Sequence, residues 1–157
     1  MQQNYMKKTM TLCIIKDKDK ILLGLKKKGF GEGRWNGFGG KVKDGESIKD
    51  AAIRELNEEA GIKPLDINKK GKLIFEFIDG DVFEVHVFSA TKFKGEIRES
   101  DEMKPQWFDV DNIPFDKMWP DDKHWFPLFL KDKIFEGRFL FKDENTIVRH
   151  ELREFEM

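Results

Sequence analysis

The sequence is poor in cysteine. Its only cysteine, Cys13, excludes a disulfide bond within the chain. Cys13 lies in the apolar run 12–15, so we expect a small buried side chain rather than a reactive thiol. A chain without disulfide bonds is typical of a reducing compartment, and we expect a cytoplasmic location.

Long apolar segments and an excess of one charge are lacking as well. No segment approaches the run of about 20 apolar residues that a membrane-spanning helix needs, so we expect no membrane partner. Residues 1–8 contain no apolar stretch typical of a secretory signal. The 29 basic and 30 acidic residues nearly balance, which argues against binding of polymeric nucleic acid. A monomer is the default assembly.

Linkers, repeats and grouped histidines are also missing from the sequence. The 157 residues fit one domain, 1–157, with residues 1–8 as a flexible N-terminus. The three histidines show no metal-ligand spacing, so we expect neither a zinc site nor a catalytic triad. The glycine-rich segment 29–40 contains no P-loop, and Asn36 replaces the third glycine of a dinucleotide-binding motif that would begin at Gly31.

Apolar alternation and turn residues predict strands and helices in mixed order. Strands are expected over residues 9–15, 20–25, 73–78, 82–91, 106–110, 134–141 and 146–155, and helices over residues 47–60 and 119–129. This order predicts an α/β (α+β) fold in which a mixed β-sheet packs against helices. The 15 phenylalanines and four tryptophans would fill its core or line a pocket for a flat ligand, and the core is the commoner place for any one of them.

The predicted helix over residues 47–60 has a clear start and end. Ser47 and Asp50 match a capping box, and Gly61 is a typical stop. At about 100° per residue, one arc of the helix is apolar, and it contains Ile48, Ala52, Ile53, Leu56 and Ala60. Along one edge of that arc lie the carboxylates of Glu55, Glu58 and Glu59.

Three carboxylates beside a buried face would repel one another, and partial burial adds to the cost. Arg54 is placed to pair with Glu58 four residues on, yet one arginine does not neutralise three acids. A divalent cation does, and oxygen ligands favour Mg²⁺ or Mn²⁺. The alternative is a solvated face of Glu and Arg, which the helix by itself favours.

The residues around the helix decide between these two interpretations. The spacing is G-x5-E-x7-R-E-U-x-E-E-x-G-U, where U is a bulky aliphatic residue, and its specified positions are Gly40, Glu46, Arg54, Glu55, Leu56, Glu58, Glu59, Gly61 and Ile62. The segment resembles the Nudix signature at all nine specified positions within 23 residues. The resemblance implies a Nudix fold, with a mixed sheet sandwiched between helices, and hydrolysis of a diphosphate linkage. It also implies that Arg54 orients the glutamates, that Glu46 supports the loop, and that Mg²⁺ is held by Gly40, Glu55, Glu58 and Glu59.

Segments outside the signature resemble one branch of that family, the animal MutT homologues, which hydrolyse oxidised purine nucleoside triphosphates. They are residues 26–40, 75–77, 85–88, 99–103 and 118–122, within a resemblance that runs from about residue 11 to residue 155. It implies cleavage of 8-oxo-dGTP and 2-hydroxy-dATP to a monophosphate and pyrophosphate, which sanitises the nucleotide pool. Glu102 matches an acid near the metal, as a ligand or an aid to the base. The matching substrate-binding positions are Thr11, Lys26, Phe30, Asn36, Phe75, Phe83, Trp119, Asp121 and Asp122.

The residue types suit a purine, which needs a flat apolar slot and a few directional polar groups. Trp119, with Phe30 or Phe75, would supply the slot. Asp121 and Asp122 also fit a plain helix N-terminus, and Asn36 a plain turn. If the two acids line a pocket, one pKa should rise, so that one protonated and one ionised carboxyl group serve different purine tautomers.

Two positions depart from the vertebrate pattern, and they leave the preferred oxidised or methylated purine open. Phe83 stands in place of a methionine, and Met10 in place of an aromatic residue. Two other functions also remain open: a Nudix hydrolase for a dinucleoside polyphosphate or a nucleotide sugar, and an inactive nucleotide-binding module. The complete set of Glu55, Glu58 and Glu59 argues against the inactive module.

Overall fold

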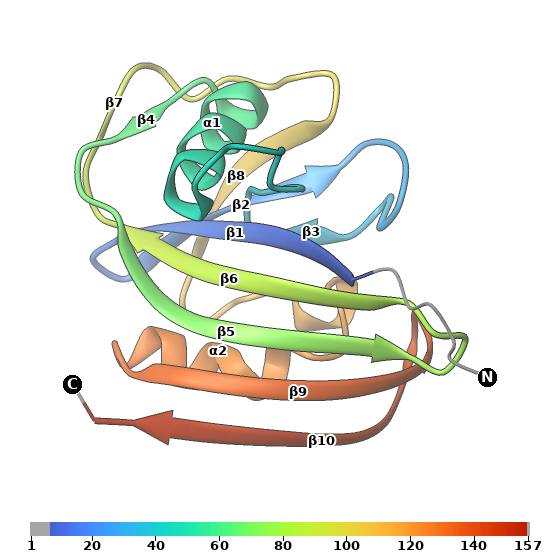
Figure 1. Ribbon diagram of the computed structural model, residues 1–157. Helices are drawn as coiled ribbons and strands as arrows, with labels where there is room; N and C mark the ends of the chain where they lie inside the picture. Colours follow the sequence, from blue (N-terminus) through green and yellow to red (C-terminus); the bar gives the residue numbers. More distant parts are fainter. Residues whose placement is uncertain (1–6, 157) are drawn as a thin grey trace.

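One mixed β-sheet, packed against helices, dominates the structure (Figure 1). The computed structural model describes residues 7–156. The strands are β1 (Lys7–Asp17), β2 (Lys20–Lys26), β3 (Trp35–Asn36), β4 (Lys63–Pro64), β5 (Asn68–Phe77), β6 (Val82–Ala90), β7 (Phe93–Lys94), β8 (Met103–Asp109), β9 (Ile134–Asp143) and β10 (Thr146–Phe155). The helices are α1 (Ile48–Ala60), α2 (Asp122–Leu130) and a 3-10 turn, η1 (Phe115–Lys117). Over residues 7–156, none of them has the length and apolar character to cross a membrane.

The main sheet has eight strands in the order β10-β9-β5-β6-β1-β2-β3, and β8 also pairs with β2. The pairs β1–β6 and β5–β9 are parallel, whereas the remaining pairs in this sheet are antiparallel. The mixed sheet predicted from the order of elements is therefore confirmed. The β4–β7 pair forms a second, two-stranded sheet.

Short polar turns produce the predicted hairpins. The β1–β2 pair closes at Asp17↔Lys20, where Lys18 has a φ of 57°. The β5–β6 pair turns at Gly80, whose φ of 113° suits glycine. The β9–β10 pair closes at Asp143↔Thr146, and β10 spans the range predicted from the sequence.

Alternation along β1 divides the core between the two faces of the sheet. Leu12 and Ile14 join the cluster that contains Trp125 and Phe126 of α2. Cys13 and Ile15 point the other way, into a cluster with Ala52, Leu56 and Ala60 of α1. Burial raises the pKa of the Cys13 thiol to about 12, in keeping with the buried, unreactive side chain expected from the sequence.

Helix α1 forms as its local sequence predicts. The Ser47 hydroxyl accepts a hydrogen bond of 3.0 Å from the Asp50 amide, and Gly61 ends the helix with a φ of 77°. The buried arc differs from the prediction at four positions, the first of which is Ile48, which is only half-buried. Ile53 is half-buried as well, whereas Glu59 and the small Ala51 are buried.

Several predicted boundaries are wrong, and sheet pairing explains why. Lys7 and Lys8 were expected in a flexible terminus, but they pair with β6 in β1; residues 1–6 lie outside the described residues. Strand β5 begins at Asn68, five residues before the predicted start, since its polar first part is held by β6. The two-residue strands β3, β4 and β7 are too short to show any periodicity in the sequence.

Removing the Leu56 side chain should destabilise the protein, because it would leave a cavity between α1 and the sheet. We expect Leu56→Ala to lower the free energy of unfolding by about 2–5 kcal/mol in urea denaturation. The exposed neighbour provides the control, and Asn57→Ala should change that free energy by less than about 0.5 kcal/mol. Equal effects of the two variants would contradict the described packing of α1.

Candidate active site

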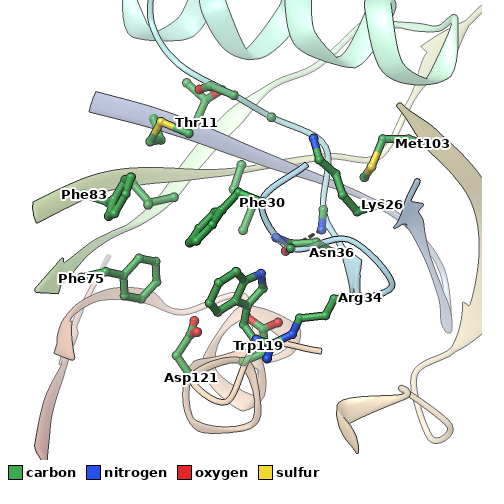
Figure 2. A pocket seen from close by; sticks show the side chains of 18 of the residues that line it. Thr11, Lys26, Phe30, Arg34, Asn36, Phe75, Phe83, Met103, Trp119 and Asp121 are labelled. Carbon is green, nitrogen blue, oxygen red and sulfur yellow. Dashed lines mark hydrogen bonds between the residues drawn. The ribbon is translucent and has the colours of Figure 1, made fainter. Parts of the chain in front are cut away.

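A cavity of about 190 Å³ lies between the sheet, the loop after β2 and the segment before α2 (Figure 2). It is smaller than the roughly 300–1,000 Å³ typical of sites for drug-sized ligands, which suits a single flat ring system. All nine residues predicted to bind substrate line it: Thr11, Lys26, Phe30, Asn36, Phe75, Phe83, Trp119, Asp121 and Asp122. Gly40 and Glu59 line the same cavity, whereas Glu55, Glu58 and Glu102 are not among its lining residues.

The parallel pairing of β1 with β6 brings distant parts of the chain to this cavity. The register sets Met10 beside Val85 and Thr11 beside His86, and the next residues of β1 continue along β6. Because β5 pairs with β6 and β9, Phe75 and Phe141 join the same wall. The segment 119–122, before and into α2, closes the opposite side.

Aromatic rings form the apolar part of the cavity. The Phe30 ring lies 5.0 Å from the Trp119 ring and 6.0 Å from the Phe83 ring, between centroids. Figure 2 shows these three side chains directed toward one space, with Phe75 beside them. Phe30 is 58% exposed, so an apolar ring on the loop after β2 is available to cover a flat ligand.

Asp121 and Asp122 form a buried acid pair at the end of the cavity. The Trp125 indole nitrogen donates a 2.8 Å hydrogen bond to Oδ2 of Asp121, whereas the buried Oδ2 of Asp122 has no hydrogen-bond partner within residues 7–156. Burial raises the pKa of both carboxyl groups, and repulsion by Asp121 adds to the rise at Asp122. The raised pKa values agree with the hypothesis that one of the two acids is protonated. The unpartnered Oδ2 of Asp122 can form a hydrogen bond with a ligand.

Asn36 is held in one orientation by its own turn. Its side-chain oxygen accepts a 2.9 Å hydrogen bond from the Gly37 amide, which is the turn role expected from the sequence. The amide nitrogen is then left to donate. Asn36 therefore combines the two predicted roles, in the turn and in the cavity wall.

Arg54 organises the acids of α1. Its guanidinium donates to Glu46 at 2.7 Å, to Glu55 at 2.8 Å and to Glu58 at 3.3 Å. The bond from Arg54 lowers the pKa of Glu46 to about 2, so Glu46 is ionised and fixes the loop before the helix. The predicted Arg54–Glu58 pair forms, but Glu58 is 53% exposed.

Glu59 is the deeply buried acid of the helix, with 2% of its surface exposed. Its Oε1 accepts a 2.8 Å hydrogen bond from the Gly39 amide. Burial nevertheless raises the pKa of Glu59 to about 8, and repulsion by Glu55 and Glu102 adds to the rise. Burial also raises the pKa of Glu55. A nearby cation would reverse both shifts.

The close approach of the glycine segment to the helix restricts this end of the cavity. A Cβ on Gly40 would lie 2.6 Å from Oε1 of Glu55, and one on Gly39 would overlap the Thr11 carbonyl group. The Gly40 carbonyl oxygen accepts a 2.9 Å hydrogen bond from the Thr11 amide and a longer one, of 3.5 Å, from the Thr11 hydroxyl. Only glycine therefore fits at Gly39, whereas a side chain at Gly40 would displace the Glu55 carboxylate.

The carboxylates near Gly40 suit a divalent cation by their chemistry, although their oxygen atoms do not surround one common point. Glu55, Glu58, Glu59 and Glu102 repel one another, and they are all oxygen donors. Across residues 7–156, however, no three side chains of His, Cys, Asp or Glu are grouped closely enough to hold a metal ion. Glu102 is half-exposed and lies 3.9 Å from the Lys26 amine. Binding a cation therefore requires side-chain movement, for which the exposed Glu58 and Glu102 have room.

Sequence reasoning missed several residues of the cavity wall, of which Arg34 is the most polar. Its guanidinium carbon lies 4.3 Å from the centroid of the Trp119 ring. Met103, Phe77 and Phe141 also line the cavity. The family-like segments 26–40 and 99–103 included Arg34 and Met103, but nothing in their spacing distinguished them from their neighbours.

The fold and this arrangement of acids and glycines have counterparts among known proteins. The model of the NUDIX domain matches residues 6–129. The chain therefore belongs to the Nudix hydrolase family, whose members generally use divalent metal ions. The fold class, family and enzyme class expected from the sequence are confirmed.

Particular relatives match almost the whole chain. A mouse protein named oxidized purine nucleoside triphosphate hydrolase is 51% identical over 145 residues, covering 92% of this chain and 93% of the relative. The zebrafish protein of the same name is 51% identical over 150 residues, covering 95% and 96%. The crystal structure of a mutator MutT protein from Bacillus halodurans is similar, with a TM-score of 0.83, 30% identity, and coverage of 92% and 97%.

The raised pKa of Glu59 predicts a pH-dependent stability of the metal-free protein. Between about pH 4.5 and 8 the folded protein keeps the Glu59 proton and the unfolded chain loses it, so stability falls as pH rises through this window. In EDTA, we expect the free energy of unfolding of the wild type to fall by about 2–3 kcal/mol more between pH 6 and 9 than that of Glu59→Gln, at about 1.4 kcal/mol per pH unit below the pKa. Urea denaturation measures the difference.

Glu58→Gln is the matched control, because Glu58 is exposed on the same helix. This variant should follow the wild-type pH dependence. If Glu59→Gln also followed it, Glu59 would not be protonated in the metal-free fold.

Proposed function

We propose that this chain hydrolyses oxidised purine nucleoside triphosphates to the monophosphate and pyrophosphate, with Mg²⁺ as its cofactor. The observation that carries the proposal is one small cavity with two different ends. Aromatic rings and a buried acid pair form one end, and Gly40 with the buried Glu59 forms the other. A base and a phosphate chain require these two environments side by side. The mouse and zebrafish relatives, by name, act on such substrates.

At the base end, recognition combines stacking with directional hydrogen bonds. Trp119 and Phe30 offer flat faces, and Phe83 extends the apolar wall. A protonated Asp122 donates to a purine edge, while Asp121, oriented by Trp125, accepts from it. The amide nitrogen of Asn36 adds a second donor. Because oxidation changes which edge atoms donate and accept, a pair that does both accommodates oxidised guanine and oxidised adenine.

At the phosphate end, the residues hold charge and take up a proton. We propose that Gly40, Glu55, Glu58 and Glu59 hold Mg²⁺, with Glu102 joining them after side-chain movement. When bound, Mg²⁺ neutralises phosphate oxygens and lowers the pKa of water. A water oxygen attacks phosphorus, the linkage to pyrophosphate breaks, and a carboxylate of this cluster accepts the water proton. Arg54 keeps Glu55 and Glu58 directed toward this end through its hydrogen bonds.

The domain organisation, the cellular location and the assembly state are proposed as well. A continuous sheet joins β1 to β10, which supports one domain over residues 1–157. A cytoplasmic location and a monomeric state stay predictions from the sequence.

Comparison of substrates tests the proposal. Pyrophosphate release should be faster from 8-oxo-dGTP than from dGTP or a dinucleoside polyphosphate, with Mg²⁺ required. Preference for the dinucleoside polyphosphate would favour the alternative Nudix hydrolase. Binding of 8-oxo-dGTP without release of pyrophosphate would favour the inactive nucleotide-binding module. Either result would overturn the proposal.

Substitution of the acid pair tests the base end separately. Because each carboxyl group is buried and supplies a hydrogen bond to the purine, we expect Asp121→Asn or Asp122→Asn to lower kcat/KM for 8-oxo-dGTP by about tenfold to a hundredfold. Steady-state kinetics at several pH values measures the loss. Asp111→Asn, on an exposed turn, should leave kcat/KM unchanged. The assignment of the base end fails if both pair variants keep wild-type activity.

A further inference from the structure

Arg34 contacts Trp119 from the loop that follows β2. Its guanidinium lies over the indole ring, 4.3 Å from the ring centroid, a favourable cation–π geometry. Figure 2 shows the two side chains in contact at the edge of the cavity. Gly31, in the same loop, approaches the indole so closely that a Cβ there would lie 3.3 Å from its nitrogen. The loop therefore packs on Trp119 at two positions.

The opposite end of the guanidinium is anchored to another part of the chain. One nitrogen of Arg34 donates a 3.0 Å hydrogen bond to the Glu144 carbonyl oxygen, and another donates to the Asn145 side-chain oxygen. Both acceptors lie in the turn between β9 and β10. Arg34 thus joins three segments of the chain: its own loop, Trp119 and this turn.

The charge of Arg34 acts on the acid pair as well. Burial raises the pKa values of Asp121 and Asp122, and the positive charge of Arg34 partly lowers both. Lys26 and Arg34 are the only basic residues in the cavity wall, so far as the described residues show. Arg34 is the one that also contacts the aromatic slot.

From these contacts we infer that Arg34 is a positioning residue for base recognition, which holds Trp119 in its stacking orientation beside the acid pair. The inference rests on the proposed function, since it names how the same cavity is kept ready for a base. Arg34 acts through Trp119 and through the charge on Asp121 and Asp122, so its loss should weaken substrate binding more than the chemical step.

Two substitutions separate stacking from charge. Arg34→Lys keeps the charge but loses the planar group that reaches both the indole and the turn. Arg34→Gln loses both. For 8-oxo-dGTP, we expect each variant to raise KM by about threefold to tenfold, with kcat changed less than twofold. KM should depend on pH through protonation of the acid pair. Without the positive charge of Arg34 the pKa of the pair rises, so the pH at which KM changes should be higher in Arg34→Gln and unchanged in Arg34→Lys.

Arg138→Gln is the control, because Arg138 is an exposed β9 residue that forms an ion pair with Glu76 at the surface. It should match the wild type in KM and in pH profile. A purely structural role for Arg34 would lower stability in urea with KM and pH profile unchanged, and that result would overturn the inference.

A measurement without substrate tests the role of Arg34 independently of the proposed function. In ligand-free protein, the ¹⁵N indole signal of Trp119, assigned with Trp119→Phe, should broaden or divide in both Arg34 variants and stay single in Arg138→Gln. A wild type that does not cleave 8-oxo-dGTP would end the proposed function, yet the indole signal would still test whether Arg34 holds Trp119. An unchanged signal and unchanged KM in an active enzyme would overturn the inference alone.

Discussion

The close contact between the glycine segment 37–40 and the backbone of β1 is the constraint on which the site depends. Phe38 and Cys13 exchange backbone hydrogen bonds of 2.9 and 2.6 Å, and the Thr11 amide donates to Gly40. The same segment, through the Gly39 amide, reaches Glu59 on α1. Without this approach, the acids of the helix and the cavity beside β1 would lie in separate places. The glycines fix the geometry before any ligand arrives.

Two groups of buried acids at opposite ends of one cavity give the site its character. Burial raises the pKa of Glu59 at one end and of Asp121 and Asp122 at the other. The surroundings of the buried acids differ between the two ends. Glu59 accepts a hydrogen bond from the Gly39 amide and has further acids nearby, whereas Asp121 accepts a hydrogen bond from the Trp125 indole. A single principle, the cost of burying an ionised carboxylate, therefore raises the pKa of acids at both ends of the cavity.

Features that depend on neighbouring residues in the sequence could be predicted from the sequence. The bounds of α1 follow from Ser47 and Gly61, and the nine substrate-binding positions, taken from the family resemblance, all line the cavity. Features set by distant partners could not be predicted. Arg34 is anchored by a turn 110 residues away in sequence, and β5 extends beyond its apolar part because β6 pairs with it. The unequal burial of neighbouring Glu58 and Glu59 likewise depends on how α1 sits on the sheet.

The burial of Cys13 has a consequence for how this chain responds to oxidants. Peroxides attack thiolates, and a thiol with a pKa of about 12 provides almost none at neutral pH. Cys13 is also enclosed beneath α1, out of reach of solvent. Peroxides would thus leave the sole sulfhydryl group of this chain in its reduced form for as long as the fold is intact.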